Sequence, residues 1–227
     1  MSTVFEALGR LAAAGFKPAT ILDGGAHVGN FARPAARIFP DADVLLIDPL
    51  DDVHAALTEL ATLQHWQFAP VALGAEAAPA VAFYKSGLQS SLLGDFDGNT
   101  WGEGDTVDVT TLDALADQYK VKPPYLLKMD LQGYELQALL GADAVLCDTP
   151  VIVTEVNFVR FQANMALFSN VAAYLFERGY DLYDLTDEGR RRDGSLRQAN
   201  AVFVQASAGL VSHQWEPGMQ MPWSGKG

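Results

Sequence analysis

Apolar runs typical of buried strands alternate along most of the chain with segments of helical spacing. The first pair consists of the run TILDGG at residues 20–25 and the helical pattern at residues 30–39. Because parallel strands joined through helices form right-handed crossovers, this alternation predicts a mostly parallel sheet with helices on both faces. We therefore expect an α/β fold of the doubly wound class.

The predicted elements continue this pattern to the end of the chain. We expect helices at residues 3–14, 30–39, 51–63, 133–146 and 166–179. We expect strands at residues 20–25, 42–49, 66–74, 78–86, 125–131, 150–158, 180–186 and 201–207. Residues 106–119 pass from strand-like alternation into a helix capped by Thr111 or Asp113. The last two strands have no helix between them, which predicts an antiparallel hairpin at one edge of a seven-stranded, Rossmann-like sheet.

A single domain is expected from the length of the chain. Its 227 residues fit one medium α/β domain, and a hydrophobic content of 49% supplies a core that needs no disulfide or metal. Residues 1–18 would form an N-terminal helix, 19–207 the core and 208–227 an irregular tail. Two alternatives are open for the tail: its tryptophans cover an apolar patch, on this subunit or on another copy in a homo-oligomer, or its end is disordered.

The charge of the chain bears on its partners. The formal net charge is −13, which would repel a phosphate backbone, so we expect no nucleic-acid partner. No apolar run approaches the length of about 18 residues that spans a bilayer, and the N-terminus lacks the pattern of a signal peptide. These features predict a cytoplasmic protein that does not bind membranes.

The stretch ILDGGAHVGNF at residues 21–31 joins a predicted strand to a predicted helix through glycines. Such a turn suits a nucleotide, because glycines allow close backbone approach and the helix start presents unpaired N–H groups. A dinucleotide fold requires the pattern GxGxxG. In that frame the chain has Gly24, Ala26 and Gly29, so the second glycine is missing.

A second frame of the same turn places an acid before the glycines: Asp23-x-Gly25-x-His27-x-Gly29. An acid at this position suits an ammonium group, as in the amino-acid half of S-adenosylmethionine, better than it suits a pyrophosphate. Asp48 ends the next predicted strand, where an acid would bind ribose hydroxyls in either nucleotide-binding scheme. The turn therefore favours the sulfonium cofactor, while Asp48 indicates only a nucleoside.

The order of motifs along the chain resembles the FkbM family of class I S-adenosylmethionine-dependent methyltransferases. The resemblance spans roughly residues 20 to 160 and rests on LDGGAHVGNF, LLIDP, VALG, SSLL, VTTLDAL, LLKMDLQGYELQALLGA and PVIVTEVN. It implies a methyltransferase that uses S-adenosylmethionine and acts on a hydroxyl of a small molecule or sugar. It also implies cofactor contacts from Asp23, Gly25, His27, Gly29, Asn30, Asp48, Ala72 and Leu73.

Two positions depart from the pattern of that family, which usually has asparagine at 27 and glutamate at 132. Asparagine and histidine are both enriched at positive φ, so His27 either serves a tight turn or takes a direct part in substrate binding or proton transfer. Gln132 removes a charge but keeps hydrogen-bonding capacity. It either alters substrate preference or satisfies backbone groups near the helix start.

Candidate catalytic residues end the two predicted strands that would flank the cleft. A carboxylate there could orient a hydroxyl or accept its proton, which makes Asp130 the first candidate and Glu155 the second. Structural alternatives are a helix cap for Asp130 and a buried ion pair of Glu155 with Lys128.

Other polar residues are weaker candidates for substrate contacts. Ser90 and Ser91 lie in a glycine-flanked segment that suits a flap or an ordinary turn, and the arginines around Arg191 suit an anionic substrate or a solvated hairpin. Lys128 and Gln132 are further candidates for substrate contacts. No His, Asp or Glu cluster has the spacing of a metal site, although separated carboxylates can still converge in space.

The sequence leaves two other functions open. A nicotinamide-dependent oxidoreductase would share the nucleotide-binding corner, but it should have a glycine at position 26. A non-catalytic protein could retain the same fold as a binding subunit.

Overall fold

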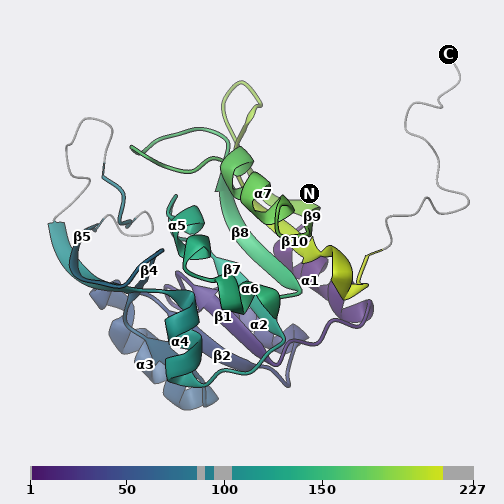
Figure 1. Ribbon diagram of the computed structural model, residues 1–227, viewed down its shortest axis with the longest axis horizontal. Coiled ribbons are helices and arrows are strands. Elements are labelled where there is room, and N and C mark those ends of the chain that lie inside the picture. The colour runs from purple at the N-terminus through teal and green to yellow at the C-terminus, as the bar shows by residue number, and fades with distance from the viewer. Residues whose placement is uncertain (1, 86–89, 95–103, 212–227) are drawn as a thin grey trace, which may run out of the picture.

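A seven-stranded sheet forms the centre of the computed structural model, which describes residues 2–85, 90–94 and 104–211 (Figure 1). The strand order is β3-β2-β1-β7-β8-β10-β9. Its strands are β1 (Thr20–Gly24), β2 (Asp43–Ile47), β3 (Gln67–Ala69), β7 (Tyr125–Met129), β8 (Val151–Asn157), β9 (Tyr180–Arg190) and β10 (Leu196–Gln205). Only β10 runs antiparallel to its neighbours, β8 and β9. The predicted doubly wound, mostly parallel sheet with an edge hairpin is therefore confirmed.

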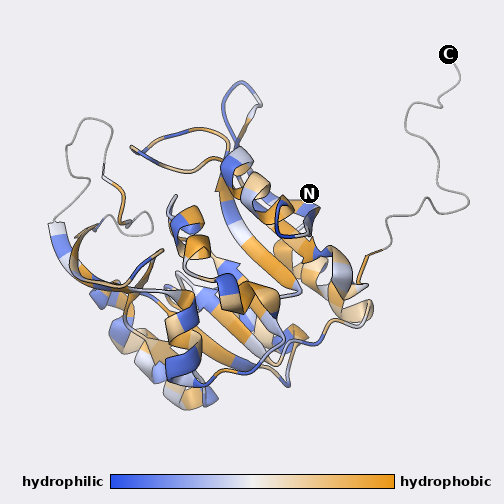
Figure 2. Ribbon diagram, viewed as in Figure 1, coloured by the Kyte–Doolittle hydropathy of each residue, from blue (hydrophilic) through white to orange (hydrophobic). Residues whose placement is uncertain are grey.

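Helices cover both faces of this sheet, and each face has its own apolar cluster. One face packs against α1 (Val4–Ala13), α2 (Ala32–Ile38) and α3 (Asp51–Gln64). The other packs against α4 (Leu112–Tyr119), α5 (Glu135–Leu140), α6 (Asp143–Cys147) and α7 (Phe168–Phe176). Successive residues of β1, Ile21 and Leu22, are both fully buried and belong to opposite clusters. This explains why the strand sequences, largely orange in Figure 2, read as continuous apolar runs.

The strand order reverses between β1 and β7. From β1 the chain continues outward through β2 and β3, whereas β7 leads to β8 and the hairpin on the other side. Open α/β sheets bind ligands at the carboxyl ends of the strands at such a switch point. Gly24 and Met129, which end β1 and β7, are register partners there.

A small second sheet flanks the main one and consists of β4 (Ala72–Leu73), β5 (Ala78–Tyr84) and β6 (Gly104–Thr110) in the order β4-β6-β5 (Figure 1). The prediction of one continuous strand at residues 66–74 is wrong. The segment divides between the two sheets, β3 in the main sheet and β4 in the small one. Pro70 stands at the division, and proline has no N–H to extend a strand ladder.

The single helix predicted at residues 133–146 is also wrong. It breaks at Gly141, where a Cβ would lie 2.2 Å from the carbonyl oxygen of Gly74. Thr111 caps α4, as one of the two predicted alternatives. Asp113 instead accepts the backbone N–H groups of Ala144 and Val145 at the start of α6, at 3.0 and 2.9 Å.

The ends of the described chain complete the fold. A capping box of Thr3 and Glu6 starts α1. A 3₁₀ turn at Ala206–Ala208 follows β10; residues 212–227, which hold most of the predicted irregular tail and its tryptophans, lie outside the described residues. Within the described residues, every helix is too short or too polar to span a bilayer.

Candidate active site

The glycine turn after β1 has a backbone that few side chains allow. Gly25, His27 and Gly29 all have positive φ, at +73°, +48° and +80°. A Cβ at position 25 would lie 2.0 Å from the carbonyl oxygen of Asp130, and one at position 29 would lie 2.4 Å from Leu60 Cδ2. Glycine is therefore required at 25 and 29, while the φ of His27 confirms that this residue serves the tight turn.

Asp48 ties this turn to the end of β2. Its Oδ2 accepts the backbone N–H of His27 at 2.7 Å, and its Oδ1 accepts that of Leu50 at 2.9 Å. Asp48 is only 6% exposed, and two backbone donors offset part of the desolvation of its carboxylate. Asp48 thus holds together the two strand ends that a nucleotide would contact.

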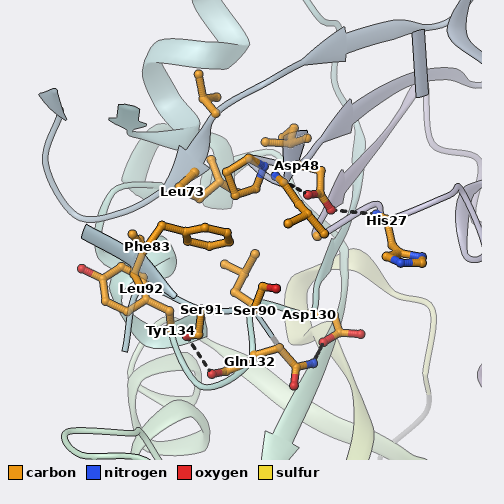
Figure 3. A pocket seen from close by; sticks show the side chains of 17 residues that line it. His27, Asp48, Leu73, Phe83, Ser90, Ser91, Leu92, Asp130, Gln132 and Tyr134 are labelled. Atoms are coloured by element: carbon orange, nitrogen blue, oxygen red, sulfur yellow. Dashed lines mark hydrogen bonds between the residues drawn. The ribbon is translucent and has the colours of Figure 1, made fainter. Parts of the chain in front are cut away.

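A cavity of about 110 Å³ lies at the switch point, and we call it the first cavity (Figure 3). Its polar lining includes His27, Asp48, Ser90, Ser91, Asp130 and Gln132. Its apolar lining includes Ile47, Leu50, Val71, Ala72, Leu73, Phe83 and Leu92. Figure 3 shows His27 and Asp130 at one end and Leu73 and Phe83 at the other. The predicted residues Gly25, Ala72 and Leu73 therefore border the same space as Asp48 and Asp130.

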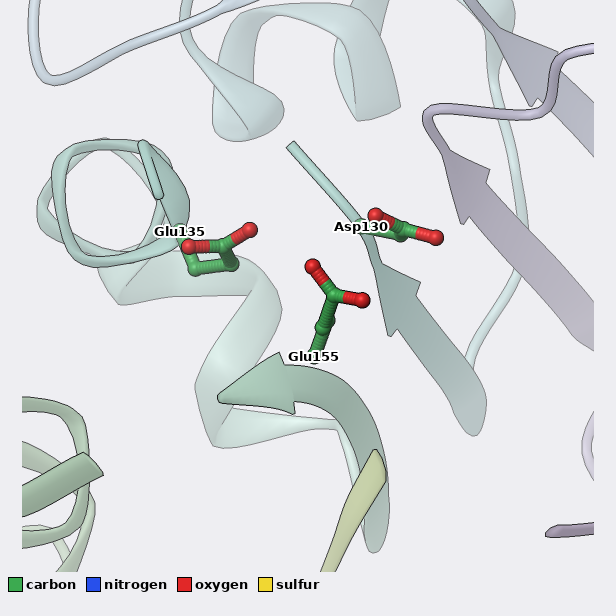
Figure 4. A group of neighbouring side chains, drawn as sticks. All are labelled: Asp130, Glu135 and Glu155. Carbon is green, nitrogen blue, oxygen red and sulfur yellow. The ribbon is translucent and has the colours of Figure 1, made fainter. Parts of the chain in front are cut away.

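Three carboxylates converge beside this cavity: Asp130 after β7, Glu155 in β8 and Glu135 at the start of α5 (Figure 4). Each has an oxygen within 4.8 Å of the others. The Gln132 amide nitrogen donates to Asp130 Oδ1 at 2.6 Å and to Glu155 Oε2 at 3.3 Å. Gln132, at positive φ, therefore connects two acids, and its side chain makes no hydrogen bond to the backbone of the described residues.

The other oxygens of this cluster are also partly engaged. Glu155 Oε1 accepts from the amide of Gln198 at 2.9 Å. Glu135 Oε1 accepts the backbone N–H groups of Leu131 and Gly133, at 2.8 and 3.1 Å. Carboxylate oxygens are the ligands that hard divalent cations prefer, and four of the six here accept hydrogen bonds from described residues. A cluster of acidic side chains is not by itself a metal site, so none is assigned to these residues.

Burial controls the protonation of the two glutamates. Burial, with Asp130 and Glu135 nearby, raises the pKa of Glu155 to about 8, and burial raises the pKa of Glu135 to about 7. Glu155 is therefore mostly protonated at neutral pH. It lines neither the first cavity nor a second cavity beside it, which is lined by Val4, Phe5 and Asp187 among others. This position does not support the expectation that Glu155 acts directly on a substrate.

The raised pKa of Glu155 predicts a pH-dependent stability. Above about pH 4.5 the unfolded chain releases this proton, but the folded chain keeps it until about pH 8, so stability falls as the pH rises between these values. Between pH 6 and pH 8.5, we expect the free energy of unfolding of Glu155→Gln to fall by about 1–2 kcal/mol less than that of the wild type. Urea denaturation at both pH values measures this, with the exposed Glu59→Gln as control. Equal losses in all three proteins would contradict the prediction.

Asp23 lies deeper than the sequence suggests. It is fully buried, and both of its oxygens lack a hydrogen-bond partner among the described residues. Lys128 Nζ lies 3.2 Å from its Oδ1 and donates to the carbonyls of Gly24 and Gly25 at 3.2 and 2.8 Å. Burial lowers the pKa of Lys128, but the carboxylates of Asp23 and Asp130 outweigh it, so the pKa stays above its usual value. Lys128 thus pairs with Asp23 and not with Glu155, and Asp23 lines neither cavity, which differs from the expected direct ligand contact.

The remaining predicted residues lie at different depths. Ser91 is buried and donates from Oγ to the carbonyl of Gln132 at 3.1 Å, so the serine segment is attached to the site. Asn30 is exposed; it does not line the first cavity but lines the neighbouring one, together with His27 and Lys128. Arg191 is exposed in the hairpin between β9 and β10 and lines neither of the two cavities, while its neighbour Arg190 pairs with Glu188.

Sequence reasoning missed several residues of the site, among them Phe83, Tyr134 and Glu135. Phe83 reaches the first cavity from the small sheet, and no local pattern marks it. Tyr134 lines the same cavity just before α5. Glu135 is an acid in the first turn of α5 and belongs to the motif LLKMDLQGYELQALLGA. Its place just after the strand that ends at the site was the sequence signal that could have identified it.

This architecture places the chain among Rossmann-like α/β proteins that bind ligands at the carboxyl edge of the sheet. The family model described as "Methyltransferase FkbM domain" matches residues 23–182, more than half of the chain. The chain therefore belongs to the FkbM methyltransferase family.

Two solved structures are similar to this chain. An FkbM methyltransferase from Methylobacillus flagellatus KT is 17% identical, with a TM-score of 0.56, over 82% of this chain and 43% of that one. This chain thus spans less than half the length of that protein. A magnesium protoporphyrin IX methyltransferase from Synechocystis PCC 6803, solved with bound SAM, is 13% identical over 88% of this chain and 76% of that one, with a TM-score of 0.48. A comparison with curated proteins finds no match.

Proposed function

We propose that this protein is an S-adenosylmethionine-dependent methyltransferase that methylates a hydroxyl group of a small molecule or sugar. Membership of the FkbM family supports the reaction class. The observation that carries the proposal is the first cavity, where the glycine turn, Asp48 and Asp130 border one space at the switch point. The choice of a hydroxyl acceptor rests on the resemblance to the family.

The residues around the first cavity fit the proposed cofactor in three respects. Each oxygen of a carboxylate can accept two hydrogen bonds, so Asp48 keeps capacity for ribose hydroxyls beyond its two backbone bonds. Leu73 and Phe83 supply an apolar wall for a flat base. The backbone at Gly25 leaves room that any side chain would fill.

Asp130 is the residue placed to act on the acceptor. Bound S-adenosylmethionine would supply a methyl group on a positively charged sulfur. Asp130 Oδ1 accepts from Gln132, while Oδ2 has no hydrogen-bond partner among the described residues. We assign this second oxygen to orient the acceptor hydroxyl and accept its proton, while Gln132 fixes the carboxylate.

Calorimetry with S-adenosylhomocysteine and with NAD tests the cofactor. We expect binding of S-adenosylhomocysteine alone, because Ala26 stands where a dinucleotide fold has its second glycine. Tight NAD binding without a response to S-adenosylhomocysteine would overturn the proposal. Screening acceptors with a labelled methyl donor then separates an enzyme from a protein that only binds the cofactor.

Asp48→Ala is expected to weaken S-adenosylhomocysteine binding by about 10- to 100-fold, since hydrogen bonds to a charged group contribute about 1.5–3 kcal/mol each. The variant removes the ribose acceptor and also releases the N–H of His27. Calorimetry measures the affinity, and Asp43→Asn at the exposed start of β2 is the matched control. Unchanged affinity in Asp48→Ala would exclude Asp48 from the cofactor site.

A further inference from the structure

A second cavity, of about 300 Å³, adjoins the first. The two share Gly25, His27 and Asp130 as lining residues. The far side of the second cavity is formed by the start of α1, with Val4 and Phe5, and by the β9–β10 hairpin, with Asp187 and Asn200. Ligands in the two cavities would therefore meet at Asp130 and His27.

The charges of the second cavity are unbalanced. Its cation is Lys128, whose Nζ pairs with Asp23 and donates to two carbonyls, so its charge is already offset. Its two carboxylates are Asp130 and Asp187. Asp187 Oδ2 accepts from the backbone of Val4 at 2.9 Å and from Asn200 at 3.3 Å, and its Oδ1 has no hydrogen-bond partner among the described residues.

The remaining lining offers both polar and apolar contacts. His27 has a buried Nδ1 without a hydrogen-bond partner among the described residues. Phe5, Phe31 and Val153 provide an apolar side. A few hydrogen-bonding groups beside apolar walls are typical of small-molecule sites.

We infer that the second cavity is the methyl-acceptor site, and that it takes an uncharged or cationic alcohol with one apolar face and excludes phosphorylated or carboxylated ones. This rests on the proposed function. An anionic acceptor would lie near two carboxylates, and among the described lining residues Lys128 is already paired, whereas a hydroxyl or ammonium can donate to Asp130 Oδ2 and Asp187 Oδ1. Asp130 then lies between acceptor and cofactor.

The test uses two sets of three probes that differ in charge: methyl glucoside, glucosamine and glucose 6-phosphate, and tyrosol, tyramine and 4-hydroxyphenylacetate. The full chain, saturated with S-adenosylhomocysteine, is titrated by NMR and its crystals are soaked with each probe. We expect the neutral and cationic members of at least one set to occupy the second cavity, with the anionic member at least about tenfold weaker. Equal binding of the anionic members, or no probe in this cavity, would overturn the inference.

Asp187→Asn provides the matched variant, with Glu188→Gln as the control that removes the same charge one residue away without lining the cavity. We expect Asp187→Asn to weaken binding of the cationic probe by about tenfold and that of the neutral probe by clearly less. The amide oxygen keeps the bonds from Val4 and Asn200, so the variant loses the charge and replaces the free Oδ1 with an amide nitrogen, from which a hydroxyl can still accept. A cationic probe insensitive to Asp187→Asn would contradict the assignment. Density for S-adenosylhomocysteine in the first cavity tests the proposed function separately.

Discussion

Lys128→Met is expected to lower the free energy of unfolding by about 3–5 kcal/mol, because it leaves Asp23 as a buried carboxylate without a compensating charge. Asp23 and Lys128 are register partners in β1 and β7, at the centre of the sheet. Asp23 is fully buried and Lys128 is 8% exposed. The substitution also removes two donors from the carbonyls of Gly24 and Gly25, so the glycine turn loses support together with the sheet.

Urea denaturation at pH 7 measures this effect. Lys122→Met, at an exposed lysine that precedes β7, should change stability by no more than about 0.5 kcal/mol. The double variant Asp23→Asn with Lys128→Met removes both charges and should recover most of the loss. A double variant as unstable as Lys128→Met would show that the ion pair is not the cause.

Asp130→Asn is expected to lower the methyl-transfer rate constant by about 10²- to 10⁴-fold, the usual contribution of a positioned general base. The amide keeps the shape of the side chain, and its oxygen can still accept from Gln132, but it cannot accept a proton from the acceptor. Affinity for S-adenosylhomocysteine should change by less than about threefold, or roughly 0.7 kcal/mol. Turnover with an acceptor identified by screening, together with calorimetry, measures both quantities.

Asp117→Asn, at an exposed aspartate of α4, is the control for Asp130→Asn. It makes the same chemical change away from both cavities and should leave turnover unchanged. A normal rate in Asp130→Asn would remove this residue from the mechanism. A loss of cofactor affinity equal to the loss of rate would assign Asp130 to binding instead.

Much of the fold could be predicted from local patterns. The apolar runs at β1, β2, β7 and β8 are buried on both faces, so their composition alone indicates central parallel strands. The small sheet was harder, because β5 is largely exposed and short β4 continues directly from β3 after Pro70. Which sheet a short strand joins depends on partners distant in sequence, and local composition does not carry that information.

In the candidate site, too, some features could be predicted from local patterns and others depend on contacts between distant segments. The glycines, Asp48 and Asp130 follow strands at the carboxyl edge, so topology alone brings them together. The partner of Lys128 depends on the register between β1 and β7, and parallel register cannot be derived from either strand separately. The contact of Gln132 with Glu155 likewise joins two chain segments whose side-chain directions only tertiary packing determines.

The wall that closes the second cavity has a consequence for synthesis of the protein. Val4 donates its backbone N–H to Asp187, 183 positions later in the chain, and Asp187 donates its own to Ser2. On the ribosome α1 emerges before the sheet, yet its anchoring residue in the hairpin is translated after nearly all of the sheet. The glycine turn can pair with β2 and β7 earlier, so the cofactor corner can form before the second cavity closes. The second cavity can therefore close only after the cofactor corner has had the chance to form, and a nascent chain stalled before residue 187 would lack it.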